Sequence, residues 1–128
     1  MISIRYDEED GIVRTVASGL ASVEEFNAYM PKALELMERS RARHGRALHL
    51  IDAADNPVQT RDTFDHIVRA SEGATREGDR FAVVLHSALA RLQINRMADA
   101  HLHRFFADSD SARGWLLDGA GTAAEAAR

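Results

Sequence analysis

Apolar and polar positions alternate at the start of the chain, which is the pattern of a strand with one buried face. Ile2, Ile4 and Tyr6 are separated by polar residues, and a second, mostly apolar stretch covers residues 12–17. The Asp10-Gly11 step between them favours a tight turn, because glycine accepts a positive φ angle. We therefore expect the chain to open with a β-hairpin.

The spacing of apolar residues then changes to that of an amphipathic helix. Ser22 and Glu25 have the spacing of a capping box, in which each side chain satisfies a backbone amide of the other residue. Pro31 lies inside the helical pattern and predicts a kink or a restart, because proline has no N–H. The apolar stripe of this helix comprises Phe26, Met30, Ala33 and Met37.

Three further apolar runs, at residues 47–51, 81–85 and 102–107, alternate with helical patterns. The second run has no polar alternation, which is typical of a central parallel strand covered on both faces. Candidate helix caps stand at Thr60 or Thr63, at Ser87, and at Asp108 or Ser109. The order predicts a single α/β domain over residues 1–118, with a mixed, mostly parallel sheet of about five strands flanked by helices. Residues 119–128 have no apolar stripe and predict a flexible C-terminal tail.

Composition narrows the function classes. The 128 residues suit one globular domain, and the absence of cysteine excludes disulfides, thiolate metal sites and cysteine nucleophiles. A net charge of -4 with scattered basic residues argues against nucleic-acid binding. No apolar run reaches the roughly 18 residues of a membrane span, and the N-terminus lacks the pattern of a signal peptide. We expect a cytoplasmic protein without an integral membrane segment.

Polar residues collect where the third and fourth strands are expected to end. The carboxyl ends of parallel strands share one edge of an α/β sheet, and ligands bind beyond that edge. Helices beginning near Thr60 and Ser87 would add unpaired amide donors there. The candidates for ligand or partner binding are Asp52, Asp55, Asn56, Thr60, His86 and Ser87.

Two catalytic interpretations compete with this binding surface. Asp52, His86 and Ser87 combine the residue types of a nucleophilic triad, but nothing in the sequence supplies an oxyanion hole or an elbow turn. A hydrolase is therefore the less favoured alternative, and no catalytic residue is assigned. His101 and His103 would share one face of a strand, but a catalytic zinc normally needs three protein ligands. We expect no metal and no cofactor.

Three segments carry a family resemblance: the strand closing on Asp52, the helix opening Leu89-Ala-Arg-Leu, and the ending Phe105-Phe-Ala-Asp followed by Ala112-Arg-Gly-Trp-Leu. In these segments and in the order of elements over residues 2–117, the chain resembles the SpoIIAA-like, or STAS-like, family of small bacterial domains. The resemblance implies a small mixed sheet flanked by helices, related to anti-sigma factor antagonists. It also implies a shape similar to that of lipid-binding SEC14 modules.

The resemblance implies a non-enzymatic regulatory module that binds a protein partner. Antagonists of this kind are switched by phosphorylation of a serine in an Asp-Ser-Ser-Gly-like motif, shortly after the strand that here ends at Asp52. In this chain Gln59-Thr60-Arg61-Asp62 stands at that place, so Thr60 is the candidate phospho-acceptor. An ordinary helix cap explains Thr60 equally well.

Two alternatives remain open at this stage. One is a SEC14-like carrier of a small apolar ligand or lipid, in which the helix carrying Phe26 and Met37 moves at Pro31. The other concerns assembly: apolar positions between Leu89 and Met97 could form the seam of a homodimer, or could simply cover the sheet.

Overall fold

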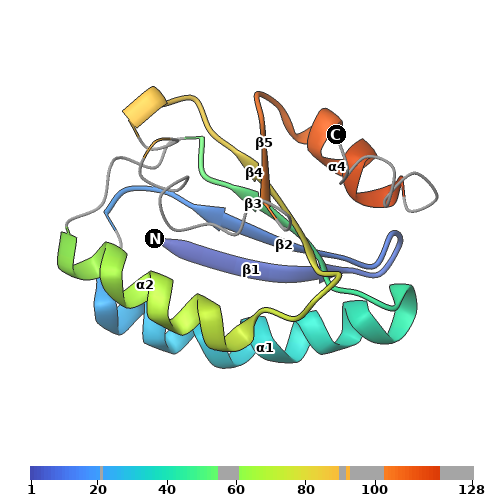
Figure 1. Ribbon diagram of the computed structural model, residues 1–128, viewed down its shortest axis with the longest axis horizontal. Coiled ribbons are helices and arrows are strands. Elements are labelled where there is room, and N and C mark those ends of the chain that lie inside the picture. Colours follow the sequence, from blue (N-terminus) through green and yellow to red (C-terminus); the bar gives the residue numbers. More distant parts are fainter. Residues whose placement is uncertain (21, 55–60, 90–91, 93–102, 119–128) are drawn as a thin grey trace.

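The computed structural model describes residues 1–20, 22–54, 61–89, 92 and 103–118. These residues form a five-stranded sheet with helices on both of its faces (Figure 1). Its strands are β1 (Ile2–Asp7), β2 (Ile12–Ala17), β3 (Leu48–Asp52), β4 (Arg80–Val84) and β5 (His103–Phe106). The helices are α1 (Val23–His44), α2 (Arg61–Ala74) and α4 (Ser109–Leu117).

The strands lie in the sheet in the order in which they occur along the chain, β1-β2-β3-β4-β5. β1 pairs antiparallel with β2, and every later pairing is parallel. The predicted hairpin and the mixed, mostly parallel sheet are therefore confirmed. Gly11 closes the hairpin with a φ angle of 70°, which is the conformation expected of the glycine in the Asp10-Gly11 step.

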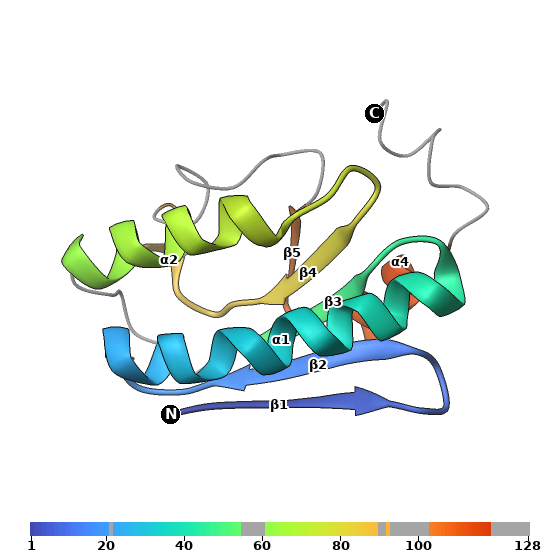
Figure 2. The ribbon, with the colours of Figure 1, turned by 90° about the horizontal axis from the view of Figure 1, so that it is seen from below.

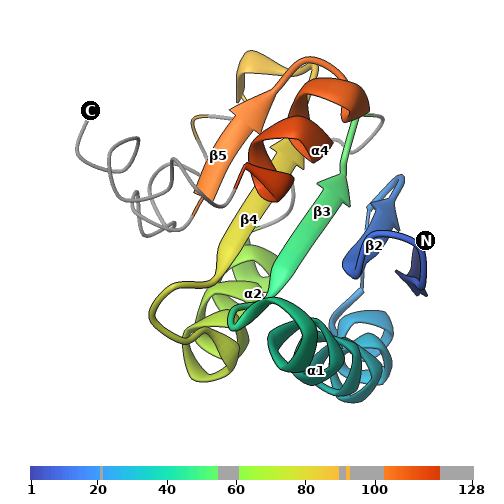
Figure 3. The same cartoon turned by 90° about the vertical axis from the view of Figure 1, so that its right-hand side faces the viewer.

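The helices divide unequally between the two faces of the sheet. α1 and α2 lie side by side on one face, and α4 lies on the other (Figures 2 and 3). α4 packs against β3, β4 and β5. On the α4 face, β1 and β2 are therefore not covered by any helix that the structure describes (Figure 3).

The buried apolar residues that the structure describes form two clusters separated by the sheet, because successive side chains of a strand point to opposite faces. One cluster lies under α4 and comprises Ile12, Leu48, Leu50, Ala82, Val84, Ala112 and Leu116. The other lies under α1 and comprises Val13, Leu36, Met37, Ala47 and Phe81. Every residue of β4 is buried, as predicted for a central strand.

The start of α1 departs in part from its prediction. The Ser22 hydroxyl accepts a hydrogen bond from the Glu25 amide at 3.0 Å, which confirms one half of the capping box. The Glu25 carboxylate instead accepts from the Ile2 amide at 2.8 Å and so attaches the helix to β1. α1 continues through Pro31 as one helix of 22 residues, so the predicted restart does not occur.

A buried carboxylate holds the loop before β4. Asp79 is 1% exposed and accepts hydrogen bonds from the amides of Ala47 and Arg76, both at 2.9 Å. Two guanidinium nitrogens of Arg41 donate to the same carboxylate, at 3.1 and 2.6 Å. Burial alone raises the pKa of Asp79, but the hydrogen bonds from Arg41 and the two amides outweigh it, and the pKa falls below its usual range.

Candidate binding surface at the carboxyl edge of the sheet

The structure brings the predicted site residues that it describes to one edge of the sheet. Asp52 is the last residue of β3 and is in register with Val84, the last residue of β4. His86 and Ser87 follow β4 directly. The other candidates, Asp55, Asn56 and Thr60, lie outside the described residues.

The hydrogen bonds at this edge do not pair Asp52 with His86. Asp52 Oδ1 accepts from the amide of Ala54 at 3.2 Å, which forms a local turn. His86 is exposed, and its Nε2 atom donates to the carbonyl oxygen of Ala107 at 3.1 Å. The carboxylate–imidazole pair of a nucleophilic triad is thus not formed between these two described side chains.

Large apolar side chains are exposed around the same edge. Val16 is 47% exposed, Leu20 60% and Val23 36%, and all three lie where β2 ends and α1 begins. Leu89 and Leu92, after β4, are 68% and 57% exposed. These two leucines are exposed, and the remaining residues of the segment from Leu89 to Met97, for which a dimer seam and a cover for the sheet were both considered, lie outside the described residues. Such a concentration of exposed apolar surface is typical of an interaction site.

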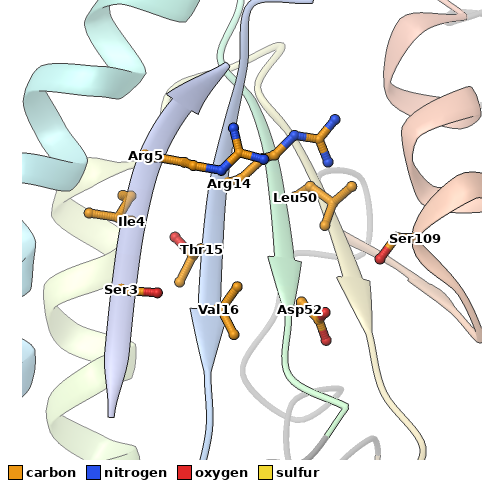
Figure 4. Close-up of a pocket in the computed structure, with 9 residues that line it drawn as sticks. All are labelled: Ser3, Ile4, Arg5, Arg14, Thr15, Val16, Leu50, Asp52 and Ser109. Atoms are coloured by element: carbon orange, nitrogen blue, oxygen red, sulfur yellow. The ribbon is translucent and has the colours of Figure 1, made fainter.

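A groove of about 300 Å³ extends from this edge over the uncovered part of the α4 face. Asp52 and Val16 are in register on β3 and β2, and Leu50 and Arg14 form the next row. Figure 4 shows the two arginines at one end of the groove and Asp52 at the other. The lining residues are Ser3, Ile4, Arg5, Arg14, Thr15, Val16, Leu50, Asp52 and Ser109.

The two arginines of the groove have different roles. Arg14 donates to Asp10 at 2.9 Å and to Asp7 at 3.2 Å, and its side chain is 18% exposed. Arg5 is 66% exposed, and its nearest carboxylate oxygen, on Asp7, is 3.8 Å away. Arg14 is therefore held by its own ion pairs, whereas Arg5 presents its guanidinium group to solvent.

Asp10 anchors this end of the groove to α4. Its carboxylate accepts from Arg14 and from Arg113 of α4, both at 2.9 Å, and from the Ile12 amide at 3.1 Å. Burial raises the pKa of Asp10, but the hydrogen bonds from Arg113, Ile12 and Arg14 outweigh this effect and leave the pKa below its usual range. The carboxylate thus stays ionised and fixes the position of Arg14.

A second polar group lies on the opposite face, between α1 and the sheet. The Thr15 hydroxyl is 2.7 Å from His49 Nε2 and 2.9 Å from the Tyr29 hydroxyl. His49 is 3% exposed, and its Nδ1 atom has no hydrogen-bond partner among the described residues. Burial lowers the pKa of His49 to about 3, with a further contribution from nearby His103, and burial raises the pKa of Tyr29 to about 12.

Sequence reasoning placed Asp52 correctly but missed most of the groove. Ser3 and Arg5 alternate with apolar residues in β1, so the sequence marked them as the outward face of the hairpin. The hairpin register pairs Arg5 with Arg14. The expected pairing of two arginines across the hairpin was therefore the sequence feature that could have predicted the basic end of the groove.

The described residues contain no group of three or more histidine, cysteine, aspartate or glutamate side chains arranged to hold a metal ion. His101, one of the two histidines considered for a metal, lies outside the described residues. No described helix is both long enough and apolar enough to span a bilayer.

Two solved structures resemble this one along nearly its full length. The crystal structure of a DUF3478-family protein with a SpoIIAA-like fold, from Shewanella loihica PV-4, aligns with a TM-score of 0.64 at 20% identity and covers 91% of this chain and 92% of its own. An anti-sigma factor antagonist from Mycobacterium paratuberculosis aligns with a TM-score of 0.58 at 15% identity and covers 92% and 96%. No protein-family model and no curated protein sequence matches the chain. The protein therefore has the SpoIIAA-like fold.

Proposed function

We propose that this protein is a non-enzymatic regulatory module that binds a protein partner through the carboxyl edge of its sheet. The observation that carries the proposal is the position of the exposed apolar residues. All the large apolar side chains that are exposed in the described structure, except Leu34 and Leu117, lie around this edge: Met1, Val16, Leu20, Val23, Leu89 and Leu92. The similarity in fold to an anti-sigma factor antagonist supports the same class of function.

The polar residues at this edge suit the rim of such an interface. Protein interfaces commonly combine an apolar centre with a polar rim that keeps access to solvent. Asp52, His86 and Ser87 lie at the same edge as the apolar residues, whereas the remaining sequence candidates, Asp55, Asn56 and Thr60, lie outside the described residues. In this proposal the apolar centre supplies binding energy and the rim selects the partner.

Thr60 is the proposed site of regulation. It directly precedes α2, which begins at Arg61. A phosphate there would add about two negative charges, next to helix amides that favour an anion. Phosphorylation of Thr60 would therefore change the charge of the proposed rim and weaken or strengthen the complex.

The proposal is tested by affinity capture with three forms of the purified protein. The double variant Leu20→Ser, Val23→Ser removes apolar surface at the edge, and Leu34→Ser removes an apolar residue that is 41% exposed on α1. We expect wild type and Leu34→Ser to recover the same partner and the double variant to lose it. Equal recovery by all three forms would place the interface elsewhere.

Thr60 is examined in the same experiment. Mass spectrometry of the protein isolated from its own cells should detect phosphate on Thr60, and Thr60→Glu should alter recovery of the partner relative to Thr60→Val. An unmodified Thr60, with equal recovery by both variants, would remove the switch from the proposal and leave the interface in place.

One observation favours the alternative of a small apolar ligand. A buried imidazole nitrogen without a partner costs free energy, and His49 Nδ1 is such an atom among the described residues. The polar head of an apolar ligand would supply the missing hydrogen bond. Native mass spectrometry of the purified protein should then show an added mass that is lost in His49→Leu.

A further inference from the structure

We propose that the groove on the α4 face binds a small amphoteric molecule with a cationic end, an apolar middle and an anionic end. Amino acids with a charged side chain and ω-amino acids belong to this class. The inference does not depend on the protein partner proposed above, because it requires only the groove and a ligand that fits its charges.

At the acidic end of the groove, one carboxylate oxygen of Asp52 accepts no hydrogen bond from the residues that the structure describes. Asp52 is half-buried, and its Oδ1 atom accepts from the Ala54 amide. No described residue donates to its Oδ2 atom. Ser109, the first residue of α4, also lines the groove near Asp52 (Figure 4). A ligand ammonium group at this end would meet a carboxylate oxygen and a hydroxyl.

The basic end is formed by Arg5 rather than by Arg14. Two nitrogens of the Arg14 guanidinium group, Nε and Nη2, already donate to Asp7 and Asp10. Among the described residues, the ion pair of Arg5 is the long 3.8 Å contact with Asp7. A guanidinium group binds a carboxylate through two parallel hydrogen bonds, so Arg5 has the chemistry to hold the anionic end of the ligand.

Apolar side chains separate the two charged ends. Val16 is 47% exposed on β2, the strand between those that carry Arg5 and Asp52, and Leu50 lies on β3 in the row of Arg14. Arg5 lies on β1 and Asp52 on β3, with β2 between them. Asp52 is two residues further along β3 than Leu50, the residue in the same row as Arg5. This places their Cα atoms about 12 Å from each other. The ligand must therefore be long enough to carry its charges at opposite ends.

The charge arrangement selects against singly charged molecules. An anion at Arg5 is also exposed to the field of Asp7 and Asp52, and a cation at Asp52 is exposed to that of Arg5. A molecule with both charges gains favourable electrostatic energy at both ends of the groove, whereas a molecule with one charge gains it at one end only. Complementary charges at the two ends thus determine specificity.

The test uses three six-carbon compounds that differ in their charged end groups: 6-aminohexanoate, hexanoate and hexylamine. Each is titrated into the isotope-labelled protein while backbone amide resonances are followed by NMR. We expect 6-aminohexanoate to bind in the millimolar range, with shifts at the amides of β1, β2 and β3. We expect each singly charged compound to bind at least about fivefold more weakly, the effect of losing one exposed ion pair.

Variants assign the site. Arg5→Gln should bring the affinity for 6-aminohexanoate to that for hexylamine, and Asp52→Asn should bring it to that for hexanoate. Val16→Trp should abolish binding because the indole fills the groove. The fold should accept the larger side chain, because Val16 is half exposed. The exposed residues Arg69 and Asp65 of α2, on the opposite face of the sheet, give the matched controls Arg69→Gln and Asp65→Asn, which should bind like wild type.

The proposal would be overturned if the three compounds bound with equal affinity, or if the site variants and the control variants lost the same affinity for 6-aminohexanoate. The proposal would also be overturned if the amide resonances of the groove did not shift at the highest concentration at which the compounds are soluble. Binding by the Leu20→Ser, Val23→Ser variant separates this inference from the proposed function. That variant should keep the affinity for 6-aminohexanoate even where it loses the protein partner.

Discussion

The Thr15 hydroxyl and His49 Nε2 lie 2.7 Å apart on neighbouring parallel strands, inside the layer between the sheet and α1. This bond satisfies one imidazole nitrogen and leaves the other, Nδ1, without a described partner. A charged imidazole in this position would lose its hydration, and the attraction of the Asp79 carboxylate is too weak to offset this loss, so the fold favours the neutral form. The consequence is a dependence of stability on pH.

We predict that the free energy of unfolding decreases as the pH falls below about 6.5. Burial lowers the pKa of His49 from 6.5 to about 3 in the folded protein, so between these values the unfolded chain binds a proton that the folded chain does not. The resulting slope approaches about 1.4 kcal/mol per pH unit. Urea unfolding between pH 7 and pH 4 measures it.

His49→Leu provides the comparison, because leucine removes the titrating group and the unpaired nitrogen together. The variant should lose less stability than wild type between pH 6.5 and pH 4, while the exposed His86→Gln should retain the wild-type slope. Identical slopes in His49→Leu and wild type would assign the acid sensitivity to other groups. Protonation of Asp10 and Asp79 also destabilises the fold, but this loss begins only near about pH 5 and grows below pH 3.8, because their pKa values are lowered from that value.

Replacement of Asp79 should be among the most destabilising changes in the chain. Asp79→Ala leaves the buried Ala47 amide without its acceptor and removes the buried one of the two carboxylates that pair with Arg41, whose side chain is 12% exposed. Loss of one member of a buried pair typically costs about 3–5 kcal/mol. Urea unfolding at pH 7 measures the loss. The exposed Asp65→Ala should stay within about 0.5 kcal/mol of wild type, and a similar effect in both variants would contradict the role assigned to Asp79.

Arg80 and Trp115 provide a probe for the docking of α4. The Arg80 guanidinium carbon lies 4.1 Å from the centre of the indole ring, and Nη1 donates to the Trp115 carbonyl at 2.8 Å. Arg80→Met removes both contacts and should destabilise the protein by about 1–2 kcal/mol. Trp115 is the sole tryptophan of the sequence, so its emission reports on the surroundings of this indole, which also include Phe106 and Arg104. An unchanged emission spectrum and an unchanged unfolding midpoint in Arg80→Met would show that α4 docks without it.

The sequence predicted the strands and helices well because their signals are local. The alternation in β1, the unbroken apolar run in β4 and the Asp10-Gly11 turn each depend on neighbouring residues. The same patterns located Asp52 at the end of β3. In these segments burial and backbone geometry agree with the local preference of the chain.

The ion pairs and the groove could not be predicted in the same way. Arg113 and Asp10 are 103 residues apart in the sequence, and no pattern relates them. The groove exists because α4 covers β3, β4 and β5 but leaves β1 and β2 open, a property of helix placement. Even within a local motif the partner of a side chain could not be predicted. The Glu25 carboxylate accepts from the Ile2 amide rather than from the Ser22 amide that a capping box specifies.

The hairpin turn is expected to tolerate no side chain at Gly11. Its φ angle of 70° disfavours any residue with a Cβ atom, and a Cβ there would lie 2.5 Å from His44 Nε2 and 2.7 Å from Arg43 Cδ. Both side chains already form hydrogen bonds with carbonyl groups of the turn. His44 is bonded to the Asp10 carbonyl, and Arg43 donates to the carbonyls of Glu8 and Glu9.

Gly11→Ala should therefore destabilise the protein by about 1–3 kcal/mol, because it adds backbone strain and displaces the contacts made by Arg43 and His44. The control is Gly73→Ala in α2, where a Cβ meets no atom within 4 Å and alanine favours the helix by about 1 kcal/mol. Thermal unfolding of the two variants should shift in opposite directions. A lowered midpoint for Gly73→Ala, or an unchanged one for Gly11→Ala, would show that the hairpin turn does not impose the constraint inferred from its geometry.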